Sequence, residues 1–297
     1  MEYDESRESF NTTEDAADKV NKNRELTPEE KWESATLANN FIFYKVMRHH
    51  PEVCKEILEL LLNIKIDHIN IHNEETIDVD FNSKGVRLDL YVTGSDKVFD
   101  IEVQTTNTGE LAERARYYQG IMDVDNLAAG ASYDKLKESH VIFLCMQDPF
   151  ARLKKNLPVY TFENICKEDL TIPLDDRTYK HFFIVPNCAK MIADRELKSF
   201  FSLLAENKSE SALTNRLKSF VDAAKQNSQW RMQFMTWEQQ KALEYRLGQE
   251  NGSLQKAIEA ATNLLRMNVL SPEQIAQAIS LPLEKVLELQ KEILEDA

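Results

Sequence analysis

The sequence contains no apolar run long enough to cross a membrane. A membrane-spanning helix needs about 20 consecutive apolar residues, whereas the densest apolar stretch, residues 54–62, is interrupted by three charged residues. The first residues also lack the basic segment and following apolar segment of a secretory signal peptide. We therefore expect a cytoplasmic protein.

Cysteine and glycine are scarce as well. The four cysteines form no Cys-x-x-Cys pair and have no histidine at zinc-finger spacing, which argues against a zinc ribbon and a disulfide scaffold. The seven glycines form neither a phosphate-binding loop nor a dinucleotide-binding fingerprint. Nucleotide hydrolysis is therefore not expected.

Basic residues are in the minority, with 36 Lys and Arg against 50 Asp and Glu, for a net charge of -14. Much of the excess lies at the ends, since residues 1–30 hold ten acids and four bases. This balance predicts weak affinity for a bare polyanion. It leaves room for metal-dependent chemistry on nucleic acid, because clustered carboxylates hold cations.

The order of hydrophobic patterns predicts an α/β fold with a mixed central sheet flanked by helices and a helical C-terminal extension. We expect an acidic, disordered tail over 1–30, one catalytic-sized domain over 31–195, and a helical region over 196–297. Within the domain, the patterns predict helices at 34–47, 51–62 and 110–126, and strands at 64–71, 86–92, 98–104, 140–146, 159–162 and 181–185.

Two of the predicted strands form a hairpin that carries two acids. A tight turn at Ser95 and Asp96 places Asp89 opposite Glu102 and Arg87 opposite Gln104. Directly opposed side chains have Cβ atoms about 4.5–5.5 Å apart, and like charges there are destabilising unless they are neutralised. A divalent cation such as Mg²⁺ or Mn²⁺ would neutralise them. The alternative is a solvated hairpin face on which Arg87 bridges the acids.

Four segments in this order resemble the PD-(D/E)XK nuclease superfamily, and within it the recombination-promoting nuclease and transposase family. The resemblance covers about residues 35–195 and rests on Ala-Asn-Asn-Phe-Ile-Phe-Tyr-Lys-Val-Met from 38, Arg-Leu-Asp-Leu-Tyr-Val from 87, Asp-Ile-Glu-Val-Gln-Thr from 100 and Arg-Ala-Arg-Tyr-Tyr-Gln-Gly from 114. It implies a restriction-endonuclease-like core and Mg²⁺-dependent hydrolysis of DNA phosphodiester bonds.

The resemblance also assigns roles to individual residues. It implies that Asp89 and Glu102 bind the metal and that Gln104 takes the place of the superfamily's catalytic lysine. Asn40 stands where the family's first motif generally has an aspartate. An amide at both places removes charge, because Asn40 offers an oxygen without charge and Gln104 cannot stabilise a developing phosphorane by positive charge. We therefore expect slow chemistry.

Three further residues are candidates for contacts with DNA. Arg116 and Gln119 follow the acidic hairpin on helix 110–126, and Lys45 lies on the first helix. An arginine there can grip a phosphate. The alternative is that Arg114 and Arg116 pair with acids of their own helix.

The C-terminal third suggests short helices that resemble a helix-turn-helix. Ser271 and Pro272 form a helix start, and the next helix carries more acids than bases, which argues against reading of the major groove. A small bundle for self-association or docking is the simpler interpretation. Taken together, the sequence predicts a metal-dependent DNA endonuclease, and the alternative is a catalytically weak or inactive nuclease scaffold that acts as an interaction or regulatory protein.

Overall fold

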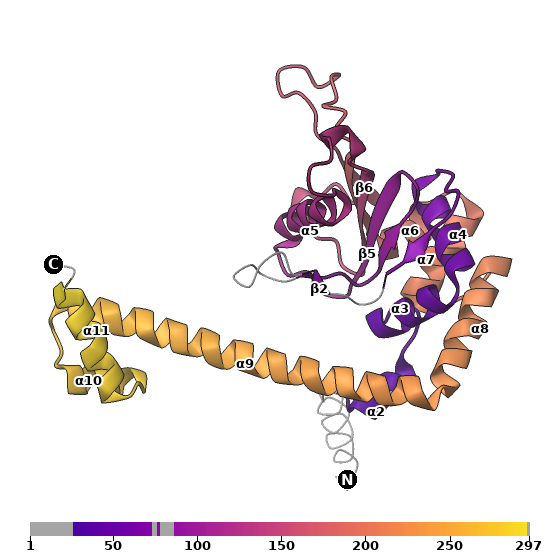
Figure 1. Ribbon diagram of the computed structural model, residues 1–297. Coiled ribbons are helices and arrows are strands. Elements are labelled where there is room, and N and C mark those ends of the chain that lie inside the picture. The colour runs from indigo at the N-terminus through magenta and orange to yellow at the C-terminus, as the bar shows by residue number, and fades with distance from the viewer. Residues whose placement is uncertain (1–25, 73–75, 78–85, 296–297) are drawn as a thin grey trace, which may run out of the picture. The chain divides into compact units, whose positions relative to one another are not determined.

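The computed structural model describes residues 26–72, 76–77 and 86–295 (Figure 1). The chain divides into two compact units, Met1–Arg231 and Met232–Ala297. The helices of the first unit are α2 (Pro28–Ser34), α3 (Asn40–His49), α4 (Pro51–Leu62), α5 (Leu111–Asn126), α6 (Val185–Met191), α7 (Arg195–Glu206) and α8 (Ala212–Gln226). Its strands are β1 (Asn70–Ile71), β2 (Thr76–Ile77), β3 (Val86–Arg87), β4 (Tyr91–Thr93), β5 (Lys97–Gln104), β6 (Glu138–Cys145), β7 (Val159–Phe162) and β8 (Thr178–Ile184).

Six of these strands form a mixed sheet in the order β1-β4-β5-β6-β8-β7. The central strands β5, β6 and β8 run parallel, and the outer strands pair antiparallel. Strand β6 is buried along almost its whole length, as expected for a strand that is covered on both faces. The predicted α/β class with a mixed, helix-flanked sheet is confirmed.

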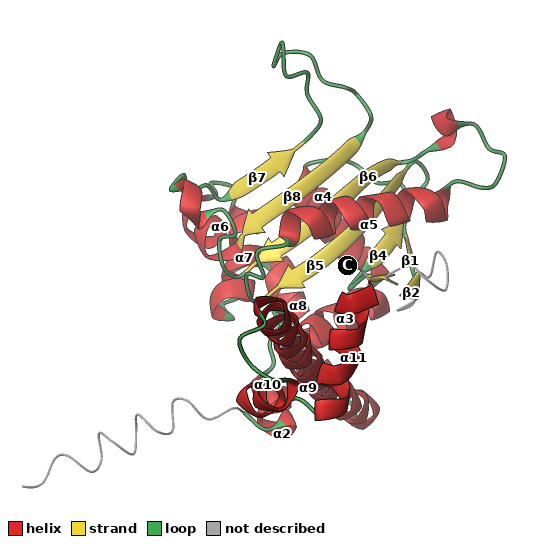
Figure 2. Ribbon diagram, turned by 90° about the vertical axis from the view of Figure 1, so that its left-hand side faces the viewer, coloured by secondary structure: helices red, strands yellow, loops and turns green. Residues whose placement is uncertain are grey.

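Helices cover both faces of the sheet. Helix α5 lies across one face, and α4, α6 and α7 lie on the other side (Figures 1 and 2). On the α5 side, Leu111, Ala115 and Met122 pack against Phe143 and Phe182 of the sheet. On the other side, Phe183 of β8 stacks on Phe201 of α7 with ring centroids 5.6 Å apart. The sheet is therefore the middle layer of a three-layer unit.

The hairpin register predicted from the turn is confirmed where β4 and β5 pair, with Tyr91 opposite Asp100 and Thr93 opposite Val98. The ladder is shorter than expected because the chain bends at Asp89 and Leu90. Arg87 therefore does not lie opposite Gln104. It pairs with Thr76 in a separate two-stranded sheet of β2 and β3.

Two other boundaries differ from the predicted pattern. The predicted strand at 64–71 is reduced to Asn70–Ile71, because a β-branched alternation forms a strand only where it meets a partner. The first helix of the predicted pair begins at Asn40 rather than at Ser34, because the Asn39 side chain accepts a hydrogen bond from the Ile42 N–H and caps it there. Residues 1–25 of the expected tail lie outside the described part, whereas its last residues belong to helix α2 from Pro28, which the capping box of Thr27 and Glu30 begins.

Helices α7 and α8 belong to the first unit, although the sequence pattern grouped them with the C-terminal helices. Arg216 of α8 forms an ion pair with Glu56 of α4. Phe220 of α8 stacks on His50, with ring centroids 3.5 Å apart. These contacts join segments about 160 residues apart in sequence, which a local pattern does not reveal.

The second unit contains most of α9 (Ser228–Met267), together with α10 (Pro272–Ile279) and α11 (Leu283–Glu295). Its small core is apolar and comprises Ala261, Ile275, Ala276, Leu281, Val286 and Leu289. Ser271 caps α10 through the capping box that its sequence suggests, with Pro272 in the first turn. Although α9 has 40 residues, no helix in the described part is both long and apolar enough to span a membrane.

The burial of one face of α4 generates a first prediction. Leu58 on α4 is fully buried, whereas Leu170, on a loop, is 70% exposed. Leu58→Ala should lower the free energy of unfolding by about 2–5 kcal/mol, because it removes apolar contacts and leaves a cavity. The matched change Leu170→Ala should alter it by less than about 0.5 kcal/mol. Urea unfolding followed by circular dichroism measures both, and equal effects would contradict the layered core.

Candidate active site

Strand β5 presents three polar side chains on the sheet face that α5 covers. Asp100, Glu102 and Gln104 alternate with the apolar residues Ile101 and Val103, so they share one face of the strand. Asp100 and Glu102 are buried, and Gln104 at the end of the strand is half-buried. This face is therefore not the solvated surface that the alternative reading of the hairpin requires.

Asp89 approaches the same place from the bend before β4. Its backbone N–H donates to Glu102 Oε1 at 2.9 Å, so the two acids lie together as the register predicted. The Asn40 side chain, at the first residue of α3, donates from Nδ2 to Asp89 Oδ2 at 2.8 Å. Helix α3, distant in sequence, therefore meets the hairpin at the two carboxylates, where Asn40 hydrogen-bonds to one of them.

Arg114 of α5 completes the cluster. Its Nη2 donates to Glu102 Oε2 at 3.0 Å, and its Nη1 donates to Gln104 Oε1 at 2.9 Å. Nη2 also donates to the Tyr118 hydroxyl at 3.0 Å. The guanidinium thus bridges the buried acid and the amide at the end of β5.

Asp100 has the least usual environment of the cluster. Its side chain is fully buried, and neither carboxylate oxygen has a hydrogen-bond partner. Burial, followed by the negative charges of Glu102 and Asp89, raises the pKa of Asp100 well above its ordinary value. Burial and the charge of Asp89 also raise the pKa of Glu102, while Arg114 opposes that shift. The cluster therefore holds more acidic groups than the single guanidinium of Arg114 can neutralise.

Sequence reasoning did not select Asp100 as a site residue, and of the two arginines at the start of helix 110–126 it selected Arg116 rather than Arg114. A signal was present for each. Asp100 lies two residues before Glu102 and therefore faces the same way on a strand. Arg114 falls between Leu111 and Tyr118 on the packed face of an amphipathic helix, where a cation needs a buried partner.

The three candidates for DNA contacts differ in their surroundings. Arg116 is exposed, two positions along α5 from Arg114, and residues two apart on a helix point in different directions. Gln119 is buried and donates to the Ser139 hydroxyl of β6. The Lys45 ammonium lies over the Phe41 ring, 5.2 Å from its centroid. The structure brings Asn40, Asp89, Glu102 and Gln104 together, but it does not bring Gln119 to them.

The donor atoms fit a hard divalent cation. Among the described residues, no three His, Cys, Asp or Glu side chains converge closely enough to hold a metal, so the protein's charged ligands would be Asp89 and Glu102. Mg²⁺ is commonly held by one or two carboxylates and keeps several waters. Burial and the charge of Asp89 disfavour the charged form of Glu102, and a bound cation would offset both effects.

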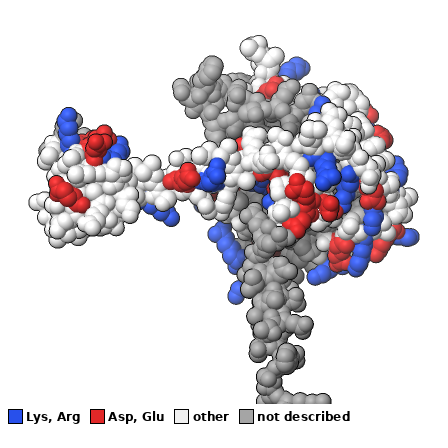
Figure 3. All heavy atoms as spheres, turned by 90° about the horizontal axis from the view of Figure 1, so that it is seen from below, with Lys and Arg blue, Asp and Glu red and all other residues white. Residues whose placement is uncertain are grey.

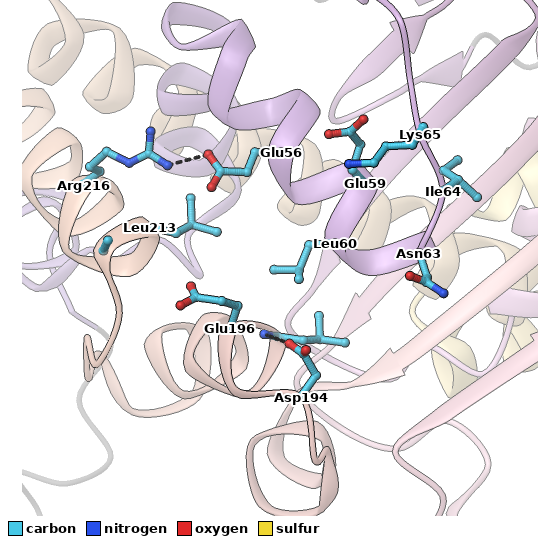
Figure 4. Close-up of a pocket in the computed structure, with 12 residues that line it drawn as sticks. Glu56, Glu59, Leu60, Asn63, Ile64, Lys65, Asp194, Glu196, Leu213 and Arg216 are labelled. Carbon is cyan, nitrogen blue, oxygen red and sulfur yellow. Dashed lines mark hydrogen bonds and ion pairs between the residues drawn. The ribbon is translucent and has the colours of Figure 1, made fainter.

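A pocket on another part of the unit does not share these residues. It is lined by the end of α4 and the starts of α7 and α8 (Figure 4). Three of its four acids have structural partners, since Glu56 pairs with Arg216, Glu59 accepts from the Ile66 N–H at 2.9 Å, and Asp194 caps α7 by accepting from the Leu197 N–H. The pocket therefore contributes nothing to the carboxylate site.

Comparison with protein families identifies the chain. A family model described as "PD-(D/E)XK nuclease family transposase" matches residues 40–266. This match covers more than half of the sequence and begins at Asn40, so the chain belongs to that family, as the sequence motifs indicated. Comparison with curated proteins and with solved structures gives no match.

The buried carboxyl of Asp100 generates a second prediction. A raised pKa means that the folded protein retains a proton that the unfolded chain releases. Stability is therefore fully present below the unfolded pKa, near 4, and is lost as pH rises toward the folded pKa. In EDTA, Asp100→Asn should make this decline shallower by up to about 1.4 kcal/mol per pH unit.

Denaturation at several values between about pH 4 and pH 8 measures the slope. Asp67→Asn changes an exposed aspartate and is the matched control, which should follow the wild-type curve. Parallel curves for Asp100→Asn and the wild type would contradict the assigned environment of Asp100.

Proposed function

We propose that the protein is a metal-dependent DNA endonuclease that hydrolyses phosphodiester bonds, of the recombination-promoting and transposase-like type, and that it acts in the cytoplasm. The observation that supports this most directly is the meeting of Asp89 and Glu102, where the Asp89 N–H donates to Glu102. Family membership supports the same reaction class.

In this proposal Asp89 and Glu102 hold Mg²⁺ or Mn²⁺. Such an ion, when bound, activates water and stabilises charge on a phosphoryl oxygen. Asn40 orients the Asp89 carboxylate through its 2.8 Å hydrogen bond. Gln104, half-buried at the end of β5, would position a water by hydrogen bonding, with its amide exchanging its present contacts with Arg114 and the Thr106 carbonyl for that water.

DNA binding would rely on few cations. On the face shown in Figure 3, Lys and Arg side chains are interspersed with Asp and Glu rather than gathered in one patch. Arg116 and Lys45 are the proposed phosphate contacts. Gln119 would hold α5 against β6 through its hydrogen bond to the Ser139 hydroxyl. Affinity should therefore depend on a cation that links the acidic site to the phosphate backbone.

The second candidate function is a weak or inactive nuclease scaffold that acts as an interaction or regulatory protein. It is favoured by the neutral amides of Asn40 and Gln104 at the site. Self-association through the C-terminal helices is compatible with both functions, since α11 exposes Leu283, Leu287 and Leu294, the last by 72%.

The third prediction tests the nuclease proposal. Asp89→Asn and Glu102→Gln should each lower Mg²⁺-dependent nicking of supercoiled DNA by at least about 10²-fold, because each removes a charged ligand while keeping the side-chain volume. Glu196→Gln, an exposed change on α7, is the matched control and should cleave normally.

Circular dichroism of all three variants checks that the fold is retained. Unaltered cleavage by both site variants would overturn the site assignment. A wild-type protein that cuts no DNA under any metal condition would favour the scaffold.

The fourth prediction concerns the amide on α3. Because Asn40 Nδ2 lies 2.8 Å from Asp89 Oδ2, Asn40→Asp should add a carboxylate beside Asp89. The variant should bind Mn²⁺ about tenfold more tightly and cut faster, but should be less stable in EDTA through repulsion of like charges. Titration calorimetry measures the Mn²⁺ affinity of the variant and of the wild type. Equal affinities would show that position 40 does not affect the metal site.

A further inference from the structure

We propose that Arg114 supplies the cationic charge of this site, with two opposed effects. It competes with a divalent cation for Glu102, and it stabilises the negative charge that develops on the phosphate during cleavage. The inference rests on the proposed function and gives a role in the reaction to a residue that begins the fourth motif and was assigned no role from the sequence.

The position of the guanidinium carries the first part of the argument. Arg114 binds Glu102 Oε2 at 3.0 Å and Gln104 Oε1 at 2.9 Å. The Glu102 side chain is 4% exposed, whereas the Arg114 side chain is 30% exposed. The guanidinium is therefore the more exposed partner of this ion pair, and solvent can reach it more readily than it reaches the buried acid.

The guanidinium is also held in place. The Tyr118 hydroxyl accepts from Arg114 Nη2 at 3.0 Å and from Nε at 3.3 Å. The group lies over the Tyr118 and Phe143 rings, with its carbon 5.4 and 5.7 Å from their centroids. A cation that is positioned before the reaction stabilises developing charge without further reorganisation.

Strand β5 itself supplies no positive charge to the site, so the charge of Arg114 fills a need. Gln104 can hydrogen-bond to a water or a phosphate, but it brings no positive charge. The pentacovalent transition state of phosphodiester hydrolysis spreads negative charge over its equatorial oxygens. The planar fork of an arginine matches two such oxygens, and its charge does not depend on pH in the physiological range.

The contact of Arg114 with Glu102 also makes the guanidinium a competitor of a metal ion for that carboxylate. A divalent cation held by Glu102 would lie close to the guanidinium that now binds the same carboxylate, and the two positive charges would repel each other. Removal of Arg114 should therefore strengthen metal binding and weaken catalysis. If Arg114 had only a structural role, its removal would disturb the site and weaken both metal binding and cleavage, rather than strengthen one and weaken the other.

Full-length Arg114→Met tests the inference, because methionine keeps apolar contact with Tyr118 and Phe143 without the charge. Arg195→Met removes an equal charge from an exposed position on α7, on the other side of the sheet, and is the control. Mn²⁺ affinity is measured by calorimetry without DNA. Nicking of supercoiled DNA is measured at saturating Mn²⁺.

We expect Arg114→Met to bind Mn²⁺ about tenfold more tightly and to cut about 10²-fold more slowly. Arg114→Lys, which keeps the charge but not the fork, should bind Mn²⁺ as the wild type does and cut at an intermediate rate. If Arg114→Met does not fold, the lysine variant still tests the inference, since wild-type cleavage or altered Mn²⁺ affinity in it would contradict the proposal.

Two other outcomes overturn the inference. If Arg114→Met cuts DNA at the wild-type rate, Arg114 has no part in catalysis. If this variant binds Mn²⁺ as tightly as the wild type or less tightly, Arg114 does not compete with the metal. In both cases the proposed nuclease function stands. If the wild type binds Mn²⁺ but cuts no DNA, the nuclease function fails, and the catalytic role of Arg114 fails with it.

Discussion

Three carboxyl groups, those of Asp89, Asp100 and Glu102, crowd against one face of a buried sheet. Like charges that are close together and withdrawn from water repel strongly. The fold offsets this repulsion with the Asp89 N–H, the Asn40 amide and the Arg114 guanidinium. It also keeps the pKa of Asp100 raised, so that this group holds its proton more readily. The hydrogen bonds and the ion pair around the site therefore hold Asp89 and Glu102 together despite their charges.

The architecture supports these contacts by bringing rigid elements to one point. The parallel strands β5, β6 and β8 form the buried centre of the sheet, and β5 ends at Gln104. Helix α5 follows directly and covers the acids, while α3 begins at Asn40 beside Asp89. A site whose groups come from strand and helix ends is held more firmly than one on loops, which suits chemistry that depends on a few charges.

Local patterns predicted the parts of this structure that local physics determines. Helix α4 has the predicted bounds and α5 begins one residue later than predicted, because 3.6-residue periodicity and Pro51 specify them without help from tertiary contacts. The turn at Ser95 set the register that brings Asp89 to Glu102. The predicted strand at 64–71 and the pairing of Arg87 were wrong, because both depended on which strand lay alongside.

By itself, the sequence determined the α/β class, the family, the strand that carries Glu102 and Gln104, and the pairing of that strand with the segment of Asp89. These follow from side-chain alternation and from motifs contained in short segments. Only the tertiary structure decided that α7 and α8 join the first unit, that Asp100 is buried without a partner, and that Arg114 binds Glu102. Burial and ion pairing depend on which distant segments meet in space, and the periodicity of one segment does not specify its partner.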